Sequence, residues 1–90
     1  MSAGPVTLLI TNKRGLHARA SARFVTLASQ YDATVTVSKD GSDVLGTSIM
    51  GLMMLAAAAG DSIAMMAEGP QAADALSALV ALVQEKFGED

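Results

Sequence analysis

The chain has 90 residues, a net charge of −3 and no cysteine. This length fits one domain over residues 1–90, and the lack of cysteine excludes disulfides and thiolate metal sites and favours a reducing compartment. The single histidine leaves almost no basis for a zinc site, and the negative charge argues against nucleic-acid binding. No apolar run approaches the roughly 20 residues that a helix needs to span a membrane. With no signal peptide visible, we expect a cytoplasmic protein that uses neither a metal nor a cofactor.

The first half of the chain predicts a strand, a helix and a hairpin, in that order. Apolar and polar residues alternate over residues 6–11, as in a half-buried strand, and residues 12–15 indicate a turn. From about residue 18 to residue 31 apolar positions recur at helical spacing, so this helix should pack on a sheet. Residues 33–39 alternate again, and a tight Asp-Gly turn leads into a short returning strand over residues 43–46.

The second half predicts a helix, a fourth strand and a last helix. Thr47 or Ser48 offers an N-cap for a helix that runs toward residue 59 and ends at Gly60. Residues 61–68 alternate as a strand, and Gly69-Pro70 opens the last helix. Its core stripe is Leu76, Leu79, Val80, Val83 and Phe87. The order βαββαβα predicts a two-layer α/β (α+β) sandwich whose mostly antiparallel sheet leaves one face open to water.

The stretch over residues 12–23 carries the strongest chemical signal. It holds the only histidine, His17, and four of the six basic residues, Lys13, Arg14, Arg19 and Arg23. His17 falls where the helix begins, and the free N–H groups and positive field of a helix start suit a phosphoryl group or another anion. The same field favours the neutral imidazole, which is the form able to attack phosphorus. The ordinary alternative is a surface or capping histidine without chemistry.

A second feature surrounds Ser48. Plain N-capping is its ordinary explanation, although a phosphate at this helix start would also be tolerated. The run that follows is apolar on two sides, with Ile49, Met50 and Met53 on one and Leu52, Leu55 and Ala56 on another. A small domain cannot easily bury both sides, so we expect an exposed apolar surface whose methionines adapt to several partners.

Two motifs resemble one known family. Gly15-Leu16-His17-Ala18-Arg19, followed by Phe24, and Thr47-Ser48-Ile49-Met50-Gly51-Leu52-Met53 are similar to HPr, the histidine-containing phosphocarrier family of the bacterial phosphotransferase system (PTS). The resemblance covers nearly the whole chain, and the alanine run over residues 56–59 resembles the alphaproteobacterial branch. It implies the HPr open-faced β-sandwich, a four-stranded antiparallel sheet with three helices on one face.

The resemblance also implies residue roles. His17 would be phosphorylated on Nδ1 by phosphorylated enzyme I and would pass the group to an enzyme IIA, with Arg19 as the active-centre arginine. Ser48 would be the regulatory serine modified by HPr kinase/phosphatase. The protein would be a monomeric carrier rather than an enzyme, with no nucleic-acid or membrane partner. Its docking surface would lie at or near Leu16, Thr47, Ile49, Met50, Gly51, Leu52 and Met53.

Two positions depart from the family pattern. Ala20 stands where proline usually follows the arginine, which makes the helix start less rigid, and Thr47 replaces a lysine beside Ser48. The destination of the phosphoryl group stays open between sugar uptake and regulation. The alternative function is a mainly regulatory binding module of nitrogen or carbon PTS signalling, and a third is a structural adaptor with an incidental histidine.

Overall fold

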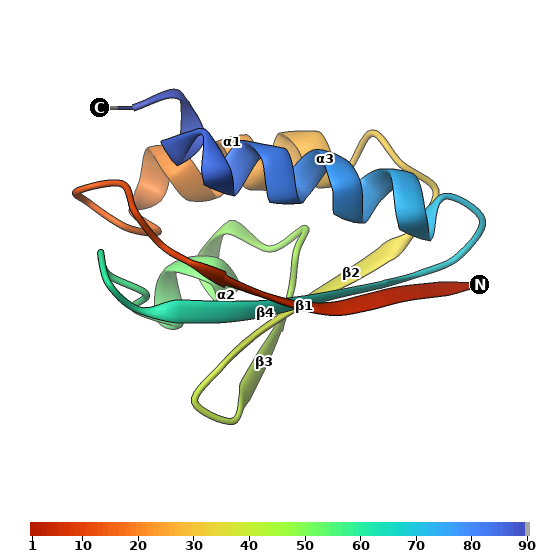
Figure 1. The fold of residues 1–90 in the computed structure, drawn as a ribbon, viewed down its shortest axis with the longest axis horizontal. Helices are drawn as coiled ribbons and strands as arrows, with labels where there is room; N and C mark the ends of the chain where they lie inside the picture. The colour runs from red at the N-terminus through yellow and green to blue at the C-terminus, as the bar shows by residue number, and fades with distance from the viewer. Residues whose placement is uncertain (90) are drawn as a thin grey trace.

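The computed structural model describes residues 1–89 and contains one four-stranded sheet and three α-helices over that range. The sheet order is β1-β4-β2-β3, and all three strand pairs are antiparallel. Figure 1 shows α1 and α3 side by side over the sheet. The elements are β1 (Ser2–Leu9), α1 (Ala18–Ala28), β2 (Thr34–Lys39), β3 (Ser42–Leu45), α2 (Ile49–Met54), β4 (Ser62–Glu68), α3 (Ala72–Gln84) and the 3₁₀ turn η1 (Lys86–Gly88). This architecture confirms the predicted fold.

The core lies between the sheet and the helices, where the alternation in the sequence placed it. Val35 and Val37 on β2 and Ile63 and Met65 on β4 point inward and are buried, as their period of two predicted. They pack with buried residues of α1, α3 and η1, of which the two phenylalanines, Phe24 and Phe87, are the largest. The opposite face of the sheet carries exposed or half-buried side chains, both polar and apolar, including Leu9 and Met66, so the sandwich is open on that side.

The first strand begins earlier than predicted. β1 starts at Ser2 rather than at residue 6 and ends at Leu9. Its pairing with β4 is shifted at one place, because Ala3 lies opposite Ala67 but Val6 lies opposite Met65. A register shift of this kind accommodates Gly4-Pro5 inside an edge strand. It also breaks the period of two, which is why the alternation did not reveal the first four residues of the strand.

The helix predicted to run from an N-cap at Thr47 or Ser48 toward residue 59 is wrong in its second half. α2 ends at Met54, and Ala56 adopts a positive φ of 54°. The carbonyl of Ala57 instead accepts a hydrogen bond from the N–H of Leu16, at 2.9 Å. Gly60, predicted to end the helix, donates its N–H to Ile10 at 2.9 Å. Alanine favours helix strongly, but these tertiary hydrogen bonds override its propensity.

The last helix also differs at both ends. α3 begins at Ala72, so Pro70 lies before the helix rather than in its first turn. The helix ends at Gln84, and the chain then turns through Lys86 and Phe87, both with positive φ, in η1. Phe87 is buried as predicted, although it lies outside the helix. This turn redirects the C-terminal segment toward the start of α1 (Figure 1).

Candidate functional site

His17 lies at the start of α1, as the sequence predicted. It is the N-cap residue, with extended backbone angles and no capping hydrogen bond from its side chain. Its carbonyl accepts the first backbone hydrogen bond of the helix from Ser21, at 2.9 Å. The N–H groups of the preceding helical residues, over 18–20, therefore have no partner inside the helix and face the His17 end. The ring is free of a structural capping role.

The loop before His17 is held by a close backbone contact. Gly15 has a φ of +61°, and a Cβ at this position would lie 2.2 Å from the carbonyl oxygen of Ala57. The next residue, Leu16, donates its N–H to that same carbonyl and buries its side chain. Only glycine allows this close backbone approach, which fixes the loop against the segment that follows α2.

Basic side chains surround the histidine. A hollow of about 240 Å³, which we call the His17 recess, is lined by Lys13, Arg14, His17, Arg19 and Glu89. The side chain of His17 is 17% exposed, so one edge of the ring reaches solvent. Arg19 is exposed and makes no ion pair within residues 1–89. The recess combines three cations with a helix start, an arrangement that attracts anions.

A carboxylate that no sequence pattern indicated completes the recess. Glu89 Oε2 lies 2.5 Å from His17 Nε2, although the two residues are 72 positions apart. Asn12, which is fully buried, donates from Nδ2 to Glu89 Oε1 at 3.0 Å and to the Gly15 carbonyl at 2.8 Å. Within the described residues, the other ring nitrogen, Nδ1, makes no hydrogen bond. The ring is thus engaged on Nε2 and open on Nδ1.

The electrostatics of Glu89 follow from these contacts. The hydrogen bond from Asn12 lowers the pKa of the Glu89 carboxyl most, and His17 and Arg23 lower it further, against a smaller opposing effect of burial. Glu89 is therefore a carboxylate at neutral pH. No local pattern could have revealed it, because a lone glutamate near the end of a chain carries no spacing signal.

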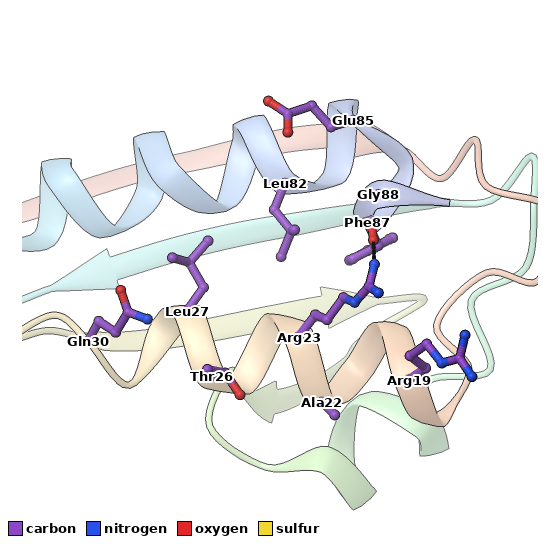
Figure 2. A pocket seen from close by; sticks show the side chains of 10 residues that line it. All are labelled: Arg19, Ala22, Arg23, Thr26, Leu27, Gln30, Leu82, Glu85, Phe87 and Gly88. Carbon is purple, nitrogen blue, oxygen red and sulfur yellow. Dashed lines mark hydrogen bonds between the residues drawn. The ribbon is translucent and has the colours of Figure 1, made fainter. Parts of the chain in front are cut away.

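A groove of about 490 Å³ lies next to the recess, with α1 on one side and the end of α3 and η1 on the other. Figure 2 shows its apolar side chains, Leu27, Leu82 and Phe87, and the Arg23 side chain that extends from α1 to donate to the backbone carbonyl of Phe87. Arg19 lines both the groove and the recess. The Arg23 contact ties the C-terminal segment to α1 close to His17.

Ser48 is the N-cap of α2, as predicted. Its Oγ accepts a hydrogen bond from the N–H of Gly51 at 3.0 Å, and its side chain is half-buried. A Cβ on Gly51 would lie 3.0 Å from that oxygen, so glycine leaves room for the cap. α1 and α2 pack together, and Figure 1 shows the start of α1 and α2 at the same end of the molecule.

The predicted exposed apolar surface is present around α2. We call its exposed side chains the methionine patch: Ile49, Met50, Met53 and Met54. Met50 is 69% exposed and Thr47 beside the patch is exposed, whereas Leu52 is 0% exposed and lies in the core. Leu16 is also buried. Neither leucine presents its side chain to a partner in this conformation; both support the surface from below.

Within residues 1–89, no group of three or more histidine, cysteine, aspartate or glutamate side chains is arranged to hold a metal ion. None of the helices in that part of the chain is long and apolar enough to cross a membrane.

Comparison with known proteins defines the class. The family model described as "PTS HPr component phosphorylation site" matches residues 6–85. The chain is 52% identical over 80 residues to the phosphocarrier protein HPr of Neisseria meningitidis, a match that covers 89% of this chain and 90% of the relative. It is also similar to the solved structure of HPr-C-His from Thermoanaerobacter tengcongensis, with a TM-score of 0.91, 43% identity and coverage of 98% and 99% of the two chains.

The fold and these matches place the chain among the small phosphocarrier proteins. The chain belongs to the HPr family and is a phosphocarrier protein of the phosphotransferase system rather than a catalyst. The catabolite repression protein Crh of Bacillus subtilis, described as a domain-swapped dimer, is also similar, with a TM-score of 0.75, 38% identity and coverage of 93% and 97%. The monomeric state expected for this chain therefore stays a prediction.

Proposed function

We propose that His17 accepts a phosphoryl group on Nδ1 from phosphorylated enzyme I and passes it to an enzyme IIA. The observation that carries this proposal is the hydrogen bonding of the two nitrogens of the His17 ring. Its Nε2 is held by Glu89, its Nδ1 is open, and the recess around it is lined by Lys13, Arg14 and Arg19. A histidine that attacks phosphorus needs a free lone pair on the attacking ring nitrogen. Its surroundings must also stabilise the negative charge of the phosphoryl group that it accepts.

The chemistry uses the helix start and the cations together. The Nδ1 lone pair forms the N–P bond while the bond between phosphorus and the donor breaks, and the reverse sequence passes the group on. The unpartnered N–H groups of residues 18–20 and the Arg19 guanidinium then solvate the phosphoryl oxygens. His17 therefore carries the covalent group, and Arg19 compensates its charge.

The methionine patch serves as the docking surface in this proposal. It lies beside Thr47 and Ser48 and on the same end of the molecule as the start of α1. Enzyme I and enzyme IIA would bury the exposed side chains of Ile49, Met50 and Met53 while approaching His17. Leu16, Gly51 and Leu52 contribute by holding the shape of this surface, because the two leucines are buried and the glycine leaves room for the Ser48 cap.

The test is phosphorylation with enzyme I, its phosphoryl donor and magnesium. Mass spectrometry should detect one acid-labile phosphoryl group on the wild type and none on His17→Ala. Ser48→Ala is the matched control, because it removes the other candidate phosphorylation site and should leave the adduct in place. Absence of an adduct on the wild type, or its persistence in His17→Ala, would refute the proposal.

A second role, regulation through Ser48 by HPr kinase/phosphatase, is favoured by the position of the serine. A phosphate on Ser48 would add a charge of about −2 beside an apolar docking surface. Its oxygens could keep the cap on the Gly51 N–H, so α2 would survive the modification. In Ser48→Asp, which retains a capping side chain, we expect partner affinity to fall on the order of tenfold relative to Ser48→Ala. Equal affinities of the two variants would count against this role.

A further inference from the structure

The C-terminal segment places one carboxylate between a buried amide and the phosphoacceptor candidate. Glu89 Oε1 accepts from Asn12 Nδ2 at 3.0 Å, and Glu89 Oε2 meets His17 Nε2 at 2.5 Å. We propose that Glu89 is a positioning residue that holds the His17 ring by its Nε2 proton, so that Nδ1 stays unprotonated and faces the open recess. This inference rests on the proposed function of His17 as the phosphoacceptor.

The carboxylate is itself held in place from several directions. Asn12 is fully buried, and its second hydrogen bond, to Gly15, locks it in the loop before the helix. The backbone before Glu89 is tied to α1 by the bond from Arg23 to Phe87, whose ring is buried in the core. A side chain anchored at both its charged end and its backbone loses little freedom when it binds the imidazole, so it can orient the ring.

The charge of Glu89 matters in the phosphorylated state. When the Nδ1 lone pair forms the N–P bond and the Nε2 proton stays in place, the ring becomes a phosphoimidazolium cation. Glu89 is the only acidic residue that lines the His17 recess within residues 1–89, where Lys13, Arg14 and Arg19 are the cations. Its carboxylate stabilises the positive ring, while the cations face the phosphoryl oxygens. On transfer the N–P bond breaks, its electron pair returns to Nδ1, and the proton has never left Nε2.

Substitution by glutamine separates this role from simple packing. In Glu89→Gln the new side chain would keep the shape of the old one but would offer one acceptor oxygen for two donors, Asn12 Nδ2 and His17 Nε2–H. If the oxygen stays on Asn12, the amide NH₂ faces Nε2 and favours the tautomer protonated on Nδ1. In that tautomer the nitrogen proposed to attack phosphorus no longer has a lone pair to donate.

The experiment compares Glu89→Gln with Glu85→Gln by ¹⁵N NMR of the histidine ring. Glu85 is exposed, lies four positions earlier on the same segment and does not line the recess, so its substitution changes the same charge without the contact. Spectra are recorded well above the pH at which histidine ordinarily titrates. The wild type and Glu85→Gln should show the proton on Nε2, protected from exchange with water. Glu89→Gln should lose that protection and gain the Nδ1-protonated form.

Phosphorylation kinetics with enzyme I provide the second measurement. We expect the rate to fall on the order of tenfold in Glu89→Gln, the effect of losing one charge-assisted hydrogen bond, and to be unchanged in Glu85→Gln. A wild-type ring spectrum in Glu89→Gln would overturn the inference, whatever the rate. An altered spectrum with a wild-type rate would overturn the role in transfer. If His17 of the wild type accepts no phosphoryl group, the proposed function fails by itself, and that result is read directly from the unmodified protein.

Discussion

Replacement of Gly15 by alanine tests whether the close backbone approach shapes the His17 loop. The added Cβ would lie 2.2 Å from the Ala57 carbonyl oxygen and 2.8 Å from Ala58 Cα. Because both are backbone atoms, no side-chain rotation relieves the clash. The loop must move, and the hydrogen bond from the Leu16 N–H to Ala57, 2.9 Å long, is lost.

The expected destabilisation has two parts. An alanine at a φ of +61° costs about 1–2 kcal/mol in a left-handed conformation. Loss of the buried hydrogen bond of Leu16 adds about 1–3 kcal/mol. The free energy of unfolding should therefore fall by about 2–5 kcal/mol, a large share of the roughly 5–15 kcal/mol that stabilises a small domain.

Urea unfolding followed by circular dichroism measures the change, with Gly41→Ala and Gly60→Ala as matched controls. Both glycines have positive φ, +84° and +94°, but a Cβ on either would meet nothing within 4 Å. In both control variants the free energy of unfolding should fall only by the cost of placing alanine in a left-handed conformation, about 1–2 kcal/mol. Both should retain the wild-type rate of His17 phosphorylation. Gly15→Ala should lose more stability and react more slowly. If Gly15→Ala is no less stable than the controls, the contact does not carry the energy assigned to it.

Three further predictions concern packing, capping and pH. Leu52→Ala should lower the free energy of unfolding, measured in urea, by about 2–5 kcal/mol. Met50→Ala should change that free energy by less than about 0.5 kcal/mol and should weaken partner binding instead. Similar losses of stability in both variants would contradict the division of α2 into a buried and an exposed side. Ser48→Ala should cost about 1 kcal/mol in the same assay, and Ser48→Asp should restore most of it, because aspartate is an equally good N-cap. Since the folded-state pKa of Glu89 is lowered, its stabilising contribution is complete above the ordinary carboxyl pKa and disappears as the pH falls through the lowered one. Thermal melts across the acidic range should therefore decline more steeply for the wild type than for Glu89→Gln, and parallel curves would contradict the assignment.

Much of the fold followed from residue periodicity. The inward positions of β2 and β4, such as Val37 and Met65, were predicted because a sheet open on one face imposes a strict alternation. The errors fell where tertiary contacts override local preference. Ala57 leaves the helix its neighbours favour in order to accept the Leu16 N–H, and the chain turns at Phe87 with a positive φ that no sequence pattern signals.

The candidate site likewise has residues that the sequence predicted and residues that it did not. His17 and Ser48 were predicted at helix starts because N-terminal caps leave local signals, and the methionine patch was predicted because α2 is apolar on two sides. Glu89 and Asn12 were not found, since their contact with the ring depends on how the C-terminal segment folds back across α1. The sequence therefore indicated the histidine that we propose to be phosphorylated, but not the carboxylate that contacts its Nε2.

The position of Ser48 decides how a phosphate there could act. Its hydroxyl contributes one capping bond, to Gly51, whereas α2 is anchored in the core by Leu52. A cap is worth about 1 kcal/mol and a buried leucine several times more, so modification of Ser48 should leave α2 folded. Any inhibition must then come from charge placed beside exposed Ile49 and Met50 rather than from unfolding. Raising the salt concentration would screen that charge, so partner affinity lost in Ser48→Asp should be partly recovered at high salt, which a structural defect would not allow.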